Sequence, residues 1–184
     1  GFDQVDAILG TPMGRPRSAV FGTADIAGLD ILVDVADGLY RNLPDDPFRE
    51  AFQLPEFMRT MLANKWLGNK TGQGFYRRTK GAGGKREIFV LDPQTMEYRP
   101  SEKVSFPSLD AAKGQDDVFD RIRTLIGGSD RAAKLAWETT ADGLIYAATI
   151  GPEITDDVRN IDNAMKWGFN MEVGPFETFD ALGV

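Results

Sequence analysis

An internal repeat constrains the fold of this chain more than any other feature. Residues 5–6 and 21–29 resemble residues 161–162 and 176–184 in type and order. Their spacing agrees to within about one residue, and a Gly and a Pro precede the second segment of each copy. This pattern predicts two related helical units. The first copy continues into a long helical pattern whereas the second does not, so we expect the second unit to be truncated.

The spacing of apolar residues predicts that most of the chain is helical. One long helix is expected over residues 23–40, with Thr23 as its cap, and another over residues 118–126. A third should begin at Ser129 and end at Gly151, where Gly and Pro follow one another. Many alanines in this third segment indicate close packing against a neighbouring helix.

A short β-rich region interrupts the helical pattern. Residues 74–78 and 86–91 are rich in aromatic and β-branched side chains, and a glycine-rich stretch at 80–85 separates them. Two such runs around a flexible turn predict a β-hairpin. The expected fold class is therefore mainly α, with two related helical units and a small β-hairpin insertion.

The best candidate for a linker is residues 99–114, because this stretch contains prolines and serines and has weak periodicity. We therefore expect a first helical unit with the hairpin over residues 1–100. A linker and the second, truncated unit should occupy residues 101–184.

Composition excludes several kinds of site. The 184 residues include no Cys and no His, which removes disulfides, thiolate zinc sites and the side chain best suited to proton transfer near neutral pH. We expect no metal site. The chain has 28 acidic and 21 basic residues, and this acidic excess argues against a nucleic-acid partner. No apolar run is long enough for a membrane span. A reducing cytoplasm is compatible with this composition and is the expected location.

Three segments resemble the C-terminal domain of 3-hydroxyacyl-CoA dehydrogenases, particularly bacterial chains that also carry an enoyl-CoA hydratase. They are MGRPRSA (13–19) with TADIAGLD (23–30), LGNKTGQGFY (67–76), and IDNAMKWGF (161–169) with GPFE (174–177). The middle segment is the most specific, and tandem copies are typical of the family. The resemblance implies a helical fold similar to the C-terminal domain of 6-phosphogluconate dehydrogenase.

The resemblance also implies an activity, the NAD-dependent oxidation of 3-hydroxyacyl-CoA in fatty-acid β-oxidation. In this family a Rossmann domain binds NAD and a His–Glu pair is the general base. The chain has no His and no glycine-rich turn between a strand and a helix. We therefore expect no catalytic and no cofactor-binding residue here, and the chain alone should be inactive. It should be the substrate-side and dimerisation region of a homodimer whose N-terminal Rossmann domain is missing.

Two sets of residues are candidates for contact with an acyl-CoA. Met13, Gly14, Arg15 and Pro16 resemble the family loop that approaches the acyl part, although Met13 is equally suited to filling a core. Residues 65–86 contain seven basic side chains and no acidic one in a chain of net charge −7.

Lys70, Arg77 and Arg78 are the candidates for the CoA phosphates within this basic segment. The simpler explanation of the segment is that its charges protect sheet edges from aggregation, because edge charges are common. In the same way, the glycines of residues 70–74 could form an anion-binding nest, but they more often shape a turn.

Two other functions remain open. The chain could be a non-catalytic helical module that dimerises or binds a partner. It could also belong to another dehydrogenase with a similar helical half that acts on a different acid. The gene upstream of Gly1 distinguishes these alternatives. Absence of a Rossmann domain there would favour the helical module, and a Rossmann domain without a His–Glu pair would favour the other dehydrogenase.

Overall fold

The computed structural model describes residues 1–183, apart from the side chain of Ala82, and divides into two compact units. The first unit contains residues 1–5 and 20–103, and the second contains residues 6–19 and 104–183. Helix α1 (Phe2–Leu9) begins in the first unit and ends in the second. The last residue of the repeat, Val184, lies outside the described residues.

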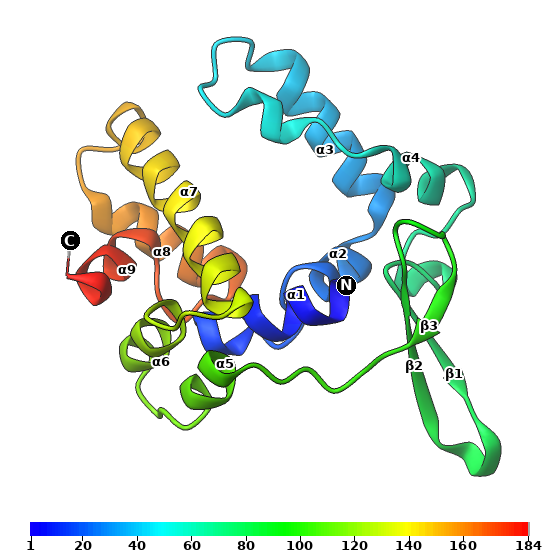
Figure 1. Cartoon of the computed structure of the whole chain (residues 1–184). Helices are drawn as coiled ribbons and strands as arrows, with labels where there is room; N and C mark the ends of the chain where they lie inside the picture. Colours follow the sequence, from blue (N-terminus) through cyan, green and yellow to red (C-terminus); the bar gives the residue numbers. More distant parts are fainter. Residues whose placement is uncertain (184) are drawn as a thin grey trace. The chain divides into compact units, whose positions relative to one another are not determined.

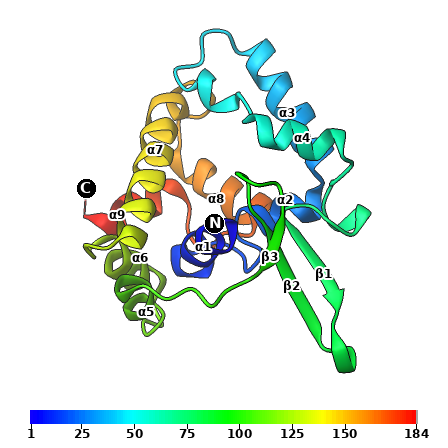
Figure 2. The same ribbon diagram turned by 45° about the vertical axis from the view of Figure 1, so that its right-hand side comes forward.

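The first unit combines helices with a small sheet (Figure 1). After α1 its elements are α2 (Phe21–Ala27), α3 (Leu29–Asn42), α4 (Glu56–Ala63), β1 (Tyr76–Lys80), β2 (Arg86–Leu91) and β3 (Tyr98–Pro100). The strands form an antiparallel sheet in the order β1-β2-β3, and Figure 2 shows β1 and β2 as an extended hairpin. Arg78 pairs with Ile88 across this hairpin, and Val90 pairs with Arg99 on the other side. The predicted hairpin is confirmed.

An aromatic cluster forms the centre of the first unit. Phe75 is 1% exposed, and its ring centroid lies 5.1 Å from that of Phe2 and 4.8 Å from that of Phe21. Leu29 of α3 and Met61 of α4 complete this core from the helical side. Residues far apart in the sequence thus share one apolar core, which fixes the sheet against the helices.

The second unit is entirely helical among its described residues. It contains the end of α1, the short turn η1 (Thr11–Met13), α5 (Pro107–Ala112), α6 (Val118–Ile126), α7 (Arg131–Ile154), α8 (Val158–Phe169) and α9 (Pro175–Leu182). Ala132, Ala133 and Ala136 of α7 are at most 1% exposed, because their small side chains allow close approach of neighbouring helices. The close packing expected from the alanines is confirmed, and so is the mainly α fold class.

Several predicted boundaries are wrong. The single helix expected over residues 23–40 starts at Phe21 and is broken at Gly28, which has φ +105°. The amide of Leu29 leaves the helical pattern there, since it donates to the carbonyl of Leu67 at 3.2 Å. The expected linker, residues 99–114, includes the change from the first to the second unit after Lys103, but its second half contains helix α5.

The caps of the later helices also differ from the prediction. Asp130 rather than Ser129 caps α7, because its carboxylate accepts hydrogen bonds from the amides of Ala132 and Ala133. Helix α7 passes through Pro152 and ends at Ile154 instead of stopping at Gly151. A proline near the end of a helix removes one hydrogen bond without ending the helix when the following residues stay helical.

The two copies of the repeat have similar local structure. In both, the segment that starts with Phe is a helix, α2 in the first copy and α9 in the second. Both helices end at a glycine with positive φ, +105° at Gly28 and +76° at Gly183. The superposition of the complete copies, and with it the division at residue 100, stays a prediction.

Candidate functional site

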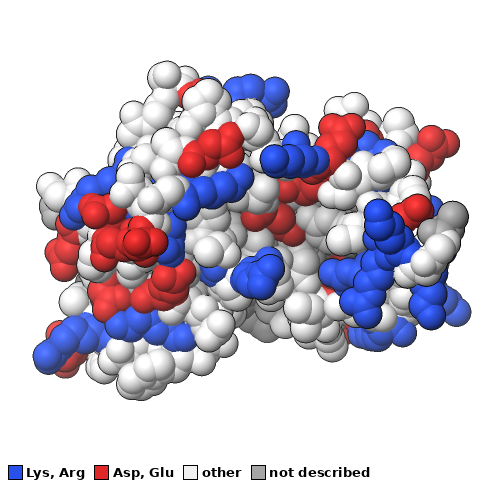
Figure 3. All heavy atoms as spheres, turned by 90° about the horizontal axis from the view of Figure 1, so that it is seen from below, with Lys and Arg blue, Asp and Glu red and all other residues white. Residues whose placement is uncertain are grey.

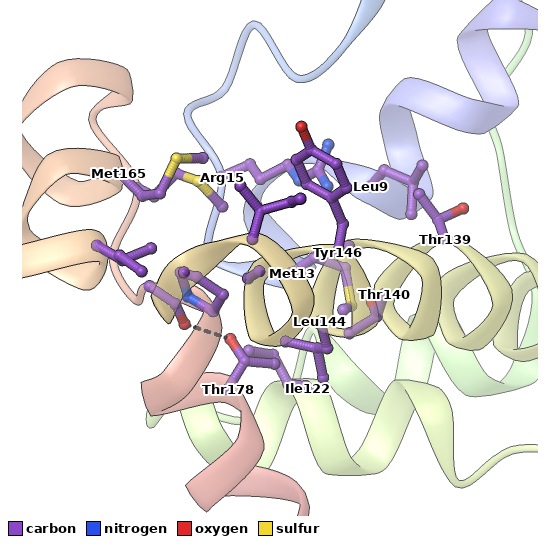
Figure 4. A pocket seen from close by; sticks show the side chains of 18 of the residues that line it. Leu9, Met13, Arg15, Ile122, Thr139, Thr140, Leu144, Tyr146, Met165 and Thr178 are labelled. Carbon is purple, nitrogen blue, oxygen red and sulfur yellow. Dashed lines mark hydrogen bonds between the residues drawn. The ribbon is translucent and has the colours of Figure 1, made fainter. Parts of the chain in front are cut away.

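A largely apolar pocket of about 420 Å³ lies within the second unit (Figure 4). We call it the α7 pocket, because one face of α7 forms its longest wall. A volume of this size falls in the range of small-molecule sites, which are mostly apolar and carry a few polar groups. Its position within one unit makes it independent of how the two units are arranged.

Helical spacing explains how the walls of the pocket arise. On α7 the lining residues recur every three or four positions from Thr139 to Ile154, and they include Leu144 and Ile150. Helix α8 contributes Ile161 and Met165, α9 contributes Pro175 and Thr178, and α1 contributes Leu9. Each helix therefore presents one stripe of side chains to a common space.

The predicted loop Met13–Pro16 reaches this pocket in part. Met13 is 6% exposed and lines the pocket, as does Arg15. Gly14 ends the turn η1 with φ +68°, and its carbonyl accepts a hydrogen bond from the amide of Glu172 at 2.7 Å. This hydrogen bond holds the loop in place. Gly14 and Pro16 are not among the lining residues.

Arg15 is the single charged side chain among the residues that line the α7 pocket. Burial lowers the pKa of its guanidinium from the usual value, but an arginine still stays protonated in proteins. Within the described part of the chain, no carboxylate or other acceptor pairs with this guanidinium. Arg15 is half-buried, and none of its nitrogen atoms is fully buried without a partner, so its charge is open to an anion that enters the pocket.

Two hydroxyl groups of the pocket are already occupied. The hydroxyl of Thr139 donates to the carbonyl of Leu135 at 2.8 Å, and that of Thr178 donates to the carbonyl of Gly174 at 2.7 Å. These bonds satisfy the threonines within their own helices. Of these three polar side chains, Arg15 is therefore the one whose donors remain available to a ligand.

The basic candidates lie in the first unit, on and near the hairpin. Figure 3 shows blue side chains gathered on the right, where the β1–β2 hairpin lies. Arg77 and Arg78 are neighbours on β1, so their side chains point to opposite faces of the sheet. The structure does not bring these two side chains together on one face.

Each of the three basic candidates has a partner in the structure. Lys70 forms an ion pair with Asp30, and Arg78 donates to Asn69 Oδ1 at 2.9 Å. The guanidinium of Arg77 stacks over the Tyr98 ring at 4.5 Å, but its buried Nε has no hydrogen-bond partner. Arg78 is thus the candidate whose charge is least neutralised or covered.

The glycine-rich segment 68–74 serves the fold around Asp25, a buried residue that the sequence analysis did not single out as functional. The carboxylate of Asp25 accepts hydrogen bonds from the amides of Phe75 at 2.8 Å and Tyr76 at 2.9 Å. A Cβ atom on Gly74 would lie 2.6 Å from Gly68 Cα, so this close approach requires glycine. The turn interpretation is favoured over an anion-binding nest, because the amides of Thr71, Gly72 and Gly74 within the segment already donate to backbone carbonyls.

One member of each of the acidic pairs Asp116–Asp117 and Asp156–Asp157 caps a helix. Asp117 caps α6 and accepts from the amides of Phe119 and Asp120, while Asp157 caps α8. In residues 1–183, no group of three or more acidic side chains is arranged to hold a metal ion. Nor does any helix there have the length and apolar character needed to cross a membrane.

The residues present do not fit a dinucleotide. The glycine-rich stretch Gly81–Gly84 lies in the turn of an antiparallel hairpin, between β1 and β2. A dinucleotide site requires a glycine-rich turn that leads from a parallel strand into a helix, whose N-terminus holds the pyrophosphate. The described sheet contains antiparallel pairs alone, so no segment of it supplies this arrangement.

The pocket walls on α7 and α8 were missed by the sequence analysis. Ile161 and Met165 are four residues apart on α8, which does indicate a common helix face. The spacing does not show what that face covers. Only the packing of α7, α8 and α9 around one space identifies these side chains as a site.

Comparison with known proteins shows which family the chain is similar to. The family described as 3-hydroxyacyl-CoA dehydrogenase, C-terminal domain, matches residues 1–78. A Bacillus subtilis protein named "Probable 3-hydroxyacyl-CoA dehydrogenase" is 44% identical over 98% of this chain and 22% of its own length. A Rickettsia felis protein described as a fatty acid oxidation complex trifunctional enzyme is 29% identical over 96% of this chain and 23% of its own length.

A shorter match covers the first part of the chain. Mouse mitochondrial hydroxyacyl-coenzyme A dehydrogenase is 38% identical over 41% of this chain and 23% of its own length. No solved structure matches the chain significantly. The chain thus spans less than a quarter of each of these relatives. The predicted resemblance is confirmed: residues 1–78 match the C-terminal domain of the 3-hydroxyacyl-CoA dehydrogenase family, and nearly the whole chain is similar to part of the Bacillus subtilis protein.

Proposed function

We propose that this chain is the substrate-side and dimerisation region of an NAD-dependent 3-hydroxyacyl-CoA dehydrogenase of fatty-acid β-oxidation. The observation that carries the proposal is the 44% identity to the Bacillus subtilis protein over nearly the whole chain. The mainly helical fold and the position of Met13 and Arg15 in an apolar pocket support it.

The proposal divides the reaction between two parts of a longer protein. A Rossmann domain outside these 184 residues would hold NAD, which would supply the hydride acceptor for oxidation of the carbon that bears the 3-hydroxyl group. Removal of the hydroxyl proton needs a positioned base near neutral pH, and this chain has no histidine for that role. The relatives are more than four times as long as the matched region, which leaves room for such a domain.

The helical region contributes to substrate binding in this proposal. The loop Met13–Pro16 faces the acyl part of the substrate, while Lys70, Arg77 and Arg78 attract the CoA phosphates. Arg78 is the strongest candidate of the three for contact with the CoA phosphates, because Lys70 is paired with Asp30 and Arg77 is stacked on Tyr98. We further propose a homodimer that works in the cytoplasm.

The test uses the complete parent protein. Purified parent should reduce NAD with a 3-hydroxyacyl-CoA, measured as the rise in NADH absorbance, and removal of residues 1–184 should abolish turnover. Reduction of NAD with a different hydroxy acid alone would indicate another dehydrogenase. A parent without any dehydrogenase activity would leave a helical dimerisation or binding module as the function.

A further inference from the structure

The α7 pocket extends well beyond Met13 and Arg15, the two lining residues that the proposed dehydrogenase role uses. It is apolar along α7 from Thr139 to Ile154, a distance of about 22 Å at the helical rise per residue. A straight alkyl chain fits such an elongated apolar wall. The charged Arg15 lines the same pocket, and Figure 4 shows its side chain among the apolar ones.

The chemistry of Arg15 selects the head group of the ligand. A guanidinium binds carboxylates with two parallel hydrogen bonds, and these are stronger than bonds between neutral groups. A thioester group or a neutral alcohol group carries no negative charge at the head of an alkyl chain. The pocket residues contain no acidic side chain that would repel an anion or neutralise Arg15.

We infer that the α7 pocket binds a free fatty acid, with its carboxylate on Arg15 and its alkyl chain along α7. This ligand is distinct from the acyl-CoA substrate of the proposed dehydrogenase, because a fatty acid carries the carboxylate that a thioester lacks. The inference rests on the pocket alone and does not depend on the proposed activity.

The test compares two ligands of equal chain length, decanoate and decanol, below their micelle concentrations. Their binding to the 184-residue chain is measured by isothermal titration calorimetry. Decanoate should bind at least about tenfold more tightly than decanol, the size of effect expected when a hydrogen bond involves a charged group. Octanoate should bind roughly fifteenfold more weakly than decanoate, since each buried methylene strengthens binding about fourfold.

Four variants separate the head group from the chain. Arg15→Gln should weaken decanoate about tenfold and leave decanol nearly unchanged. Arg17→Gln is its control, because Arg17 is exposed and does not line the α7 pocket. Gly143→Phe should weaken both ligands by filling the pocket. Gly143→Ala should weaken neither, because a Cβ atom there meets no atom within 4 Å.

Several results would overturn the inference. Equal affinity of the natural chain for decanoate and decanol would show that Arg15 does not recognise the head group. Absence of decanoate binding would show that the pocket is not a fatty-acid site. The comparison of the two ligands decides the matter even if Arg15→Gln fails to fold. None of these outcomes bears on whether the parent protein oxidises 3-hydroxyacyl-CoA.

Discussion

Replacing Asp25 by Asn tests the account of the segment 68–76 most sharply. Asp25 is 3% exposed, and its two carboxylate oxygens accept from the amides of Phe75 and Tyr76. Asparagine has one carbonyl oxygen, so one of these buried amides would face an NH₂ group and lose its acceptor. The change keeps the size of the side chain and removes only its charge and one acceptor.

The magnitude follows from these two bonds. A hydrogen bond to a charged group contributes about 1.5–3 kcal/mol, and a buried donor without a partner costs about 1–3 kcal/mol. The two effects overlap, so Asp25→Asn should lower the free energy of unfolding by roughly 2–4 kcal/mol. That is a large share of the ~5–15 kcal/mol by which a domain is stable.

The repeat supplies a matched control. Asp180 occupies the corresponding position of the second copy but is exposed, so Asp180→Asn should change the free energy of unfolding by less than about 0.5 kcal/mol. Urea unfolding followed by circular dichroism measures both variants. Equal stabilities of Asp25→Asn and Asp180→Asn would refute the anchoring role of Asp25.

Three further changes have defined outcomes. The Asp130 carboxylate accepts hydrogen bonds from the amide and hydroxyl of Ser108 and from the amides of Ala133 and Ala132, which lowers its pKa to about 2. The ionised carboxylate therefore stabilises the fold above the usual pKa near 3.8, and this stabilisation is lost as pH falls. The stability advantage of the natural chain over Asp130→Asn should therefore shrink between pH ~4 and ~2 in urea titrations, and a constant advantage would contradict this. Gly143→Ala should raise the free energy of unfolding by up to about 1 kcal/mol, because alanine favours a helix more than glycine and its Cβ atom would meet no other atom within 4 Å. A decrease in the free energy of unfolding would show that this position has no room for a side chain. In the parent protein, Arg78→Glu should raise the KM for acyl-CoA at low salt and less so at ~150 mM salt, whereas an unchanged KM at low salt would favour edge protection.

The sequence predicted the fold class because its signals are local. Helical spacing over residues 118–126 and the β-rich runs around residues 80–85 lie within single elements. The break at Gly28 was missed, since a glycine within a helical pattern is tolerated. The hydrogen bond from Leu29 to Leu67 that stabilises the break joins positions 38 residues apart.

The candidate site was predicted less completely than the fold. Resemblance drew attention to Met13 and Arg15, and the structure places both in the lining of one pocket. The rest of that lining comes from α7, α8 and α9, whose apolar stripes would look the same around a filled core. Side-chain burial and the lack of an acceptor for Arg15 arise from tertiary packing, which no local pattern contains.

The division of labour between this chain and an N-terminal domain can be measured directly. Purified 184-residue chain is mixed with NAD and a 3-hydroxyacyl-CoA, and NADH absorbance is followed before and after addition of the separately expressed N-terminal part of the parent. The chain alone should give no turnover, because its described residues form no dinucleotide site and its sequence contains no histidine, and the mixture should give measurable turnover. Turnover by the chain alone would contradict the account.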